Sequence, residues 1–179
     1  MNPSDAVLRR RIKWLTWFFI VGLFLSGATA IPLESELNLL ARLVGADIGS
    51  SGVPPAASGL AHWILLVRDA LHTTNTRFPF MAYGTDWLAF GHFVIAIAFI
   101  GALRDPVRNI WLFTFGMIAC VLLIPYAFVM GAVRGIPLEW GLIDCSFGIG
   151  GVVPVWLCRK WARELELRQI TKHSSADHR

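Results

Sequence analysis

The chain has 179 residues, of which 55% are hydrophobic and only 16% are charged, and its mean hydropathy is +0.58. Soluble domains carry roughly 25% charged residues, so this composition excludes an ordinary soluble domain and is typical of a membrane protein. The formal net charge is +4. The basic residues flank apolar runs and do not form one patch, and this distribution argues against a nucleic-acid-binding surface.

Four apolar runs approach or exceed the length that crosses a membrane. They cover residues 14–31, 86–103, 110–133 and 140–158. A membrane-spanning helix needs about 20 mostly apolar residues, and aromatic residues at the ends extend the shorter runs. We therefore expect an all-α fold, an integral membrane bundle of four antiparallel helices in a single domain of residues 1–170. The tail at 171–179 is predicted to be disordered.

Clusters of Lys and Arg predict the orientation of these spans. They are RRRIK (9–13) before the first run, RDPVR (104–108) between the second and third, and CRKWAR (158–163) after the fourth. Positively charged flanks stay on the cytoplasmic side of a membrane. All three clusters therefore predict that both termini are cytoplasmic, and we expect the membrane to be a bacterial inner (plasma) membrane.

The first run has a second interpretation. The basic cluster, the apolar stretch and the sequence ATA (28–30) also fit a signal peptide with a cleavage site, whose removal would leave three spans. The run is longer than a signal-peptide core of about 7–15 residues. This length, together with its Trp and Phe residues, favours retention as a membrane helix.

The segment 32–85 is too long to be a simple turn. Apolar residues recur every three or four positions on both sides of the break GSSGVPPAAS (49–58). The pattern predicts two amphipathic helices that lie on the outer membrane surface or cap the bundle. In the second of them we interpret His62, Asp69 and His72 as a solvated polar face.

Ionisable residues in or beside the apolar runs are the candidate functional residues, because they are costly in hydrocarbon. His92 shares its helix face with small residues, and Asp144 shares its face with Gly148 and Gly151. Both faces are suited to helix contacts. The sequence predicts a polar cavity that opens outward, with Asp86 and Arg134 at its mouth, Tyr126 and Asp144 below them, and His92 at its floor.

Structural interpretations of the same residues stay open. His92 can be a hydrogen-bonding contact between helices. Asp144 can lie near a helix start, where the helix dipole favours acids. Asp86 fits the N-cap of the second span, and Arg134 fits the headgroup zone.

The sequence contains no recognisable metal or cofactor motif. Cys120, Cys145 and Cys158 lie in or next to apolar runs without a CxxC pattern, so we interpret them as buried apolar side chains. His62 and His72 would be about 15 Å apart along a helix, too far to bind one metal ion. We expect no cofactor or metal, with a b-type haem bound through His92 as the alternative.

Three classes of function follow from these patterns. The absence of nucleotide-binding, metalloprotease and hydrolase motifs favours a non-enzymatic membrane subunit or accessory protein. The second class is a small-molecule or lipid-handling membrane protein, enzyme or carrier, that uses the predicted cavity. The third is haem or quinone electron transfer. The expected partners are the lipid bilayer, another membrane protein or a small apolar ligand, and not nucleic acid.

Overall fold

The computed structural model describes residues 3–43 and 59–177, and every regular element in these two segments is helical. The elements are α1 (Pro3–Ala30), α2 (Leu33–Leu43), α3 (Gly59–Arg77), the 3-10 helix η1 (Pro79–Ala82), α4 (Tyr83–Arg104), α5 (Ile110–Arg134) and α6 (Leu138–Asp177). Four helical segments, α1, η1 with α4, α5 and α6, are long and apolar enough to cross a membrane. The prediction of an all-helical fold with four helices of spanning length is confirmed.

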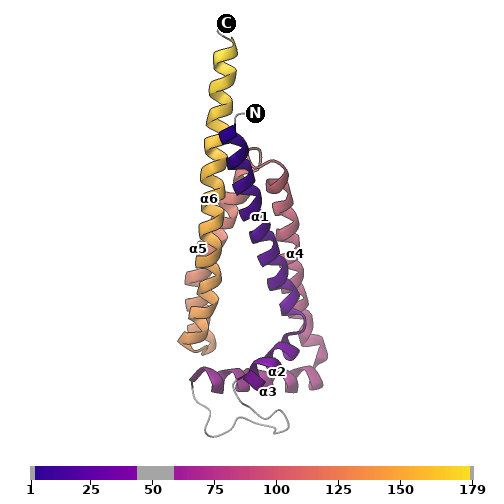
Figure 1. The fold of residues 1–179 in the computed structure, drawn as a ribbon. Coiled ribbons are helices and arrows are strands. Elements are labelled where there is room, and N and C mark those ends of the chain that lie inside the picture. Colours follow the sequence, from indigo (N-terminus) through magenta and orange to yellow (C-terminus); the bar gives the residue numbers. More distant parts are fainter. Residues whose placement is uncertain (1–2, 44–58, 178–179) are drawn as a thin grey trace.

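The four long helices associate as two pairs. Helix α1 packs along α4, and α5 packs along α6, while α1 and α6 provide most of the contact between the pairs. Figure 1 shows the pairs close together near the two termini and diverging toward the opposite end, across which α2 and α3 lie. We call the first end the terminal end. We call α2 and α3 together the layer.

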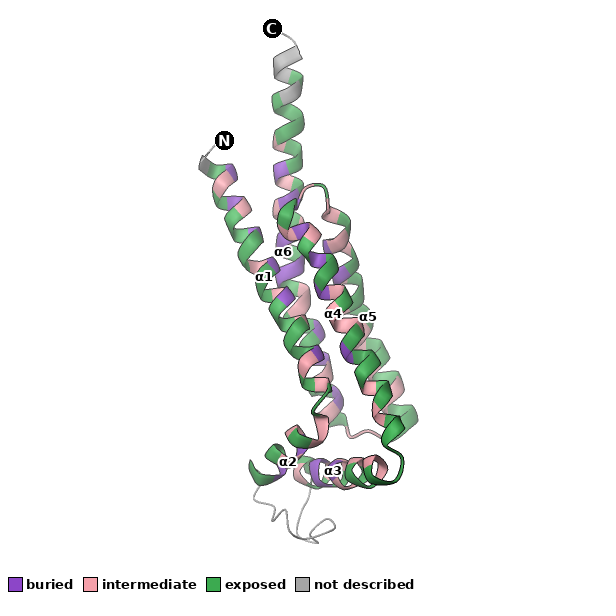
Figure 2. Cartoon of the chain, turned by 90° about the vertical axis from the view of Figure 1, so that its right-hand side faces the viewer, coloured by how far each residue is buried: buried purple, intermediate pink, exposed green. Residues whose placement is uncertain are grey.

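The main core lies in the half of the molecule nearer the terminal end. Its buried members come from all four long helices: Leu8, Ile12, Ile20, Ala96, Phe99, Ala102, Phe113, Val155, Cys158, Ala162 and Leu165. The Phe99 ring of α4 is fully buried, with its centroid 4.8 Å from that of Phe19 in α1 and 6.3 Å from that of Phe113 in α5. One aromatic side chain therefore joins three helices. Figure 2 shows exposed residues along the sides of the same helices.

Glycines allow close contact within each helix pair. A Cβ atom at Gly148 of α6 would lie 2.7 Å from the Cys120 carbonyl oxygen of α5, and one at Gly151 would lie 2.8 Å from the Cys120 sulfur. On α1, a Cβ at Gly27 would lie 2.9 Å from the Ala89 carbonyl oxygen of α4. Small residues let membrane helices approach closely. The predicted contact role of Gly148 and Gly151 is confirmed.

Local polar contacts close the two short turns between long helices. The Asn109 side chain donates to the carbonyl oxygens of Gly101 and Asp105, at 3.1 and 2.8 Å, and orders the turn between α4 and α5. Helix α5 ends at Gly135, whose φ of 68° is a left-handed conformation that favours glycine. The Ile136 N–H then donates to the Gly131 carbonyl oxygen at 2.9 Å. Both turns are therefore specified by residues close in sequence.

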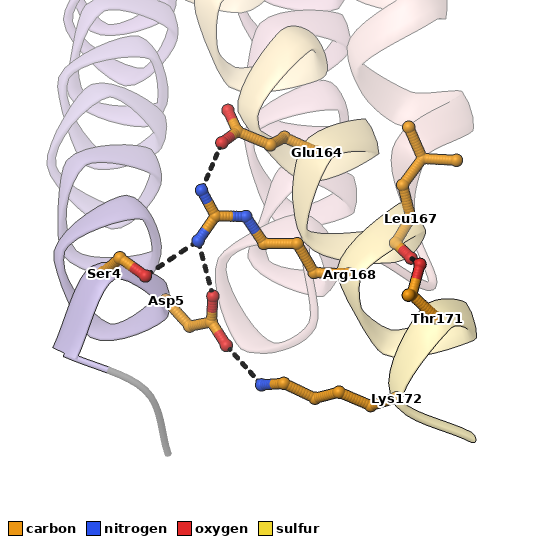
Figure 3. Close-up of polar contacts among 7 residues, drawn as sticks. All are labelled: Ser4, Asp5, Glu164, Leu167, Arg168, Thr171 and Lys172. Atoms are coloured by element: carbon orange, nitrogen blue, oxygen red, sulfur yellow. Dashed lines mark hydrogen bonds and ion pairs between the residues drawn. The ribbon is translucent and has the colours of Figure 1, made fainter. Parts of the chain in front are cut away.

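Helix α6 is longer than the sequence predicts. It continues to Asp177 and so includes residues 171–177, where we expected disorder. Figure 3 shows how this extension is attached to the start of α1: Asp5 accepts hydrogen bonds from Arg168 and Lys172, both at 2.9 Å. These cross-helix bonds give the polar end of α6 partners that a free tail would lack.

Arg168 is the centre of this attachment. Besides Asp5, its guanidinium donates to the Glu164 carboxylate at 2.6 Å and to the Ser4 hydroxyl at 2.8 Å. The bond to Glu164 joins neighbouring turns of one helix, whereas the bonds to Ser4 and Asp5 join two helices. Arg168 therefore couples the helicity of the α6 extension to its contact with α1.

Candidate functional site

His92 lies at the contact between α4 and α1. Its Nδ1–H donates to the Leu88 carbonyl oxygen one turn earlier, at 2.8 Å, so this ring nitrogen is satisfied within its own helix. A Cβ atom at Gly27 of α1 would lie 3.0 Å from the His92 Cβ. Ala89 and Ala96 on the same side of α4 are buried. The small-residue face is therefore a helix contact as predicted, and α1 is the helix that it meets.

Asp144 and Tyr126 lie on the other helix pair. Asp144 is half-buried in the second turn of α6, and within the described residues its carboxylate has no hydrogen bond or ion pair. Tyr126 of α5 is 68% exposed. No hydrogen bond joins either residue to His92 across the described part of the chain. These are the partners that the sequence suggested for His92, and their contact with it stays a prediction.

Asp86 and Arg134 lie at helix ends. Asp86 lines a shallow depression of about 240 Å³ together with Tyr83, Trp87 and Phe90. The N-cap prediction for Asp86 is wrong, because η1 leads directly into α4 and the helix begins at Tyr83. Arg134 is the exposed last residue of α5. The cavity shared by Asp86, Arg134 and the three deeper residues stays a prediction.

The layer contains a polar cluster that the sequence analysis missed. Glu34 of α2 accepts a hydrogen bond from His72 Nδ1 at 2.7 Å and another from the Asn75 amide at 2.8 Å, both from α3. His72 and Asn75 are three positions apart, so they share a helix face. His72 is exposed, as the predicted solvated polar face requires, and its partner is Glu34 and not Asp69. The sequence signal for this contact was Glu34, the acid in the first turn of α2.

Electrostatics at this cluster favour the charged carboxylate. The hydrogen bond from His72, followed by that from Asn75, holds the pKa of the Glu34 carboxyl below its ordinary value. The His72 side chain remains 67% exposed, so its second ring nitrogen is accessible to solvent. Across residues 3–43 and 59–177, no three His, Cys, Asp or Glu side chains are close enough to bind one metal ion. The cluster therefore connects α2 to α3.

Acid is expected to loosen this connection. The pKa of Glu34 is lowered on folding, so the ionised carboxylate stabilises the folded state. This stabilisation is complete above the ordinary pKa of about 4.3 and is lost as the pH falls through the lower folded pKa. Protection of α2 amides against hydrogen exchange should therefore decrease below about pH 4.3. Glu34→Gln should remove this acid-dependent decrease in protection, and Glu36→Gln on the same helix should keep it. An unchanged acid step in Glu34→Gln would contradict the assignment.

Arg68 and Trp63 of α3 are the other unusual polar groups of the layer. The Arg68 side chain is buried, and its Nη1 atom has no hydrogen-bond partner among the described residues. The Trp63 indole nitrogen is likewise buried and unpaired within the same set. Two buried donors on one helix without acceptors are rare in folded proteins.

The candidate residues thus fall into two groups, the separated residues of the spans and the connected residues of the layer. Comparison of the chain with protein-family models, with curated proteins and with solved structures gives no match.

Proposed function

We propose that the chain is a non-enzymatic membrane subunit or accessory protein that assembles with another membrane protein. In this proposal the four spans are antiparallel and both termini lie in the cytoplasm of a bacterium. The amphipathic helices α2 and α3 lie outside the inner membrane. Support comes from the basic clusters at 9–13, 104–108 and 158–163, because α1 begins, α4 and α5 meet, and α6 leaves the core at one end of the molecule. No cofactor is part of the proposal.

The observation that carries the proposal is the lack of cover over α5. Its buried residues are Phe113 and Gly116, both in its first third, and no residue from Met117 to Arg134 is buried. On the neighbouring helix, Asp144 has no partner among the described residues. An unpaired acid within a membrane span is costly unless a neighbouring helix or polar surface receives it. A partner helix against α5 and α6 would supply both the packing and the polar contact.

Loss of assembly on neutralising Asp144 is the expected result. The chain has a mass of 19.9 kDa, so in mild detergent we expect the wild-type protein to migrate on native gels as a complex larger than this. Asp144→Asn should release the chain from the complex, and His92→Ala should mainly lower thermal stability because His92 is at an internal helix contact. Asp69→Asn in the layer is the matched control and should keep the complex.

Site-directed cross-linking gives an independent readout of the same proposal. In a chain whose three cysteines are replaced by alanine, Val129→Cys on α5 should cross-link to a partner in native membranes. Ile97→Cys on α4 is equally apolar and exposed and should give no such product. A chain that stays monomeric in several detergents and gives no product from α5 would contradict the proposal.

Small-molecule or lipid handling is the second candidate. It is favoured by Asp144, a half-buried acid within an apolar span that has no partner among the described residues. In this case Asp144→Asn and His92→Ala would leave the size of the particle unchanged and would abolish ligand binding. The native gel therefore separates the two candidates.

A further inference from the structure

Arg68 is a buried cation for which the described residues supply no counter-charge. Its residue is only 6% exposed, and its Nη1 atom is buried without a hydrogen-bond partner in that part of the chain. A guanidinium has five N–H donors and no acceptor, and it stays protonated in proteins. An uncompensated buried charge is strongly destabilising. The environment of Arg68 therefore calls for an anion.

The acids of the layer do not fill this role. Both carboxylate oxygens of Glu34 already accept hydrogen bonds, from His72 and from Asn75. Asp69 follows Arg68 in sequence and thus lies about 100° away around the helix. No ion pair joins Arg68 to any acid within the described residues. An anion for Arg68 therefore has to come from outside this set.

Trp63 provides a second, independent observation on the same helix. Its indole N–H is buried and has no acceptor among the described residues. A neutral N–H and a guanidinium fork both require acceptor oxygens, and a phosphate group presents several of them with negative charge. Arginine forms two parallel hydrogen bonds with phosphate, which lysine cannot do. Trp63 is five positions from Arg68 and thus about 140° away around the helix, so only the guanidinium fork of Arg68 is assigned to the phosphate.

The position of the layer brings it to the depth of lipid headgroups. Helix α2 begins two residues after α1 ends, at Leu33 after Ala30, and α3 continues through η1 into α4. Figure 1 shows both helices crossing the ends of the long helices. If these helices span a bilayer, as the proposed function requires, the layer lies at the membrane–water interface, where Trp and Arg meet phosphates.

We propose that Arg68 binds a phosphate group, supplied by the headgroup of an anionic phospholipid or by free phosphate. This site goes beyond the proposed subunit function and shares with it only the membrane placement. Binding would neutralise the buried guanidinium and would complete the layer. The ligand would therefore stabilise the folded protein in proportion to its binding affinity.

The test uses the full chain in micelles of a maltoside detergent, which contains no phosphate, with or without added phosphatidylglycerol, and in the same detergent with inorganic phosphate in place of chloride. Unfolding is followed by tryptophan fluorescence, and bound lipid is identified by native mass spectrometry. For the wild type we expect phosphatidylglycerol to raise the Tm by roughly 5 °C and to be retained. An equal rise with inorganic phosphate would assign free phosphate as the source.

Arg68→Gln is expected to abolish the phosphate-dependent rise. In the detergent alone its Tm should equal or exceed that of the wild type, because the uncompensated charge is gone. A merely structural arginine would lower the Tm in every condition. Arg42→Gln, an exposed arginine of α2, is the matched control and should respond like the wild type.

Three results would overturn the proposal. One is an equal response of Arg68→Gln and the wild type to both phosphate sources. Another is the absence of any rise in the wild type with either phosphate source, which is informative even where Arg68→Gln does not fold. The third is energetic coupling of Arg68→Gln with Asp47→Asn in the detergent alone, because the chain's own carboxylate would then neutralise Arg68. Subunit assembly is read separately on native gels, so its failure is distinguishable from failure of this site.

Discussion

Phe99→Ala is expected to lower the free energy of unfolding by about 3–5 kcal/mol, the range for removing a buried phenylalanine ring. The ring of Phe99 is fully buried between Phe19 and Phe113. It also approaches Gly116, where a Cβ would lie 3.0 Å from its outermost carbon. In a bilayer, packing contacts replace much of the hydrophobic driving force between helices, so a void at this junction loses contacts in three helices at once.

The measurement is thermal or denaturant-induced unfolding of the purified protein in detergent micelles. Phe90→Ala is the matched control, because Phe90 is on the same helix and 55% exposed. It removes the same ring from the surface, and we expect a change below about 1 kcal/mol. Equal effects of the two substitutions would contradict a core centred on Phe99.

Gly148→Ala is expected to destabilise the chain by about 1–3 kcal/mol, although only one methyl group is added. Its Cβ would lie 2.7 Å from the Cys120 carbonyl oxygen. Because this oxygen belongs to the backbone of α5, no side-chain rotation can relieve the clash, and the two helices must separate. The expected result is a lower unfolding temperature in the same detergent assay.

Gly150→Ala is the control for the glycine substitution. Nothing lies within 4 Å of a Cβ at Gly150, so the added methyl group meets no neighbour. Alanine favours a helix over glycine by up to about 1 kcal/mol, and this variant should be neutral or slightly more stable. A loss in Gly150→Ala as large as that in Gly148→Ala would show that helix propensity, and not the contact with α5, governs the effect.

Properties that depend on local sequence were predictable. The third apolar run was expected at 110–133, and α5 covers Ile110–Arg134. The segment between the first two spans was expected to contain two helices, and α2 and α3 are found there. The sequence also predicts that Gly45 ends the first of these helices and that Ser58 caps the second, and both positions lie outside the described residues. Hydropathy and periodicity are calculated over neighbouring residues. They therefore predict where a helix lies in the sequence and which of its faces is apolar, but not which other helix it contacts.

Properties that depend on distant residues were not predictable. His72 meets Glu34, which is 38 positions away, and Arg168 meets Asp5, which is 163 positions away. A helix-face pattern identifies the side on which such a group lies and leaves its partner open. The same reason explains His92, whose small-residue face was expected from the sequence while α1 as its neighbour was not.

The wrong N-cap at Asp86 has a different cause. The residues before α4 form η1, which continues into the helix and moves its start to Tyr83. The Thr85 hydroxyl donates to the Ala82 carbonyl oxygen at 2.7 Å, within the first turn. The sequence GTDW (84–87) can therefore place Asp86 at an N-cap only where the residues before it are not helical.

The length of α6 has a mechanical consequence. Its 40 residues measure about 60 Å along the helix axis, and the part beyond Leu165, the last buried residue of the main core, accounts for about 18 Å of that length. A tilt of about 10° of this part would displace its far end by about 3 Å by this geometry. The hydrogen bonds of Asp5 to Arg168 and Lys172 oppose such a tilt, because they hold this part of α6 against the start of α1.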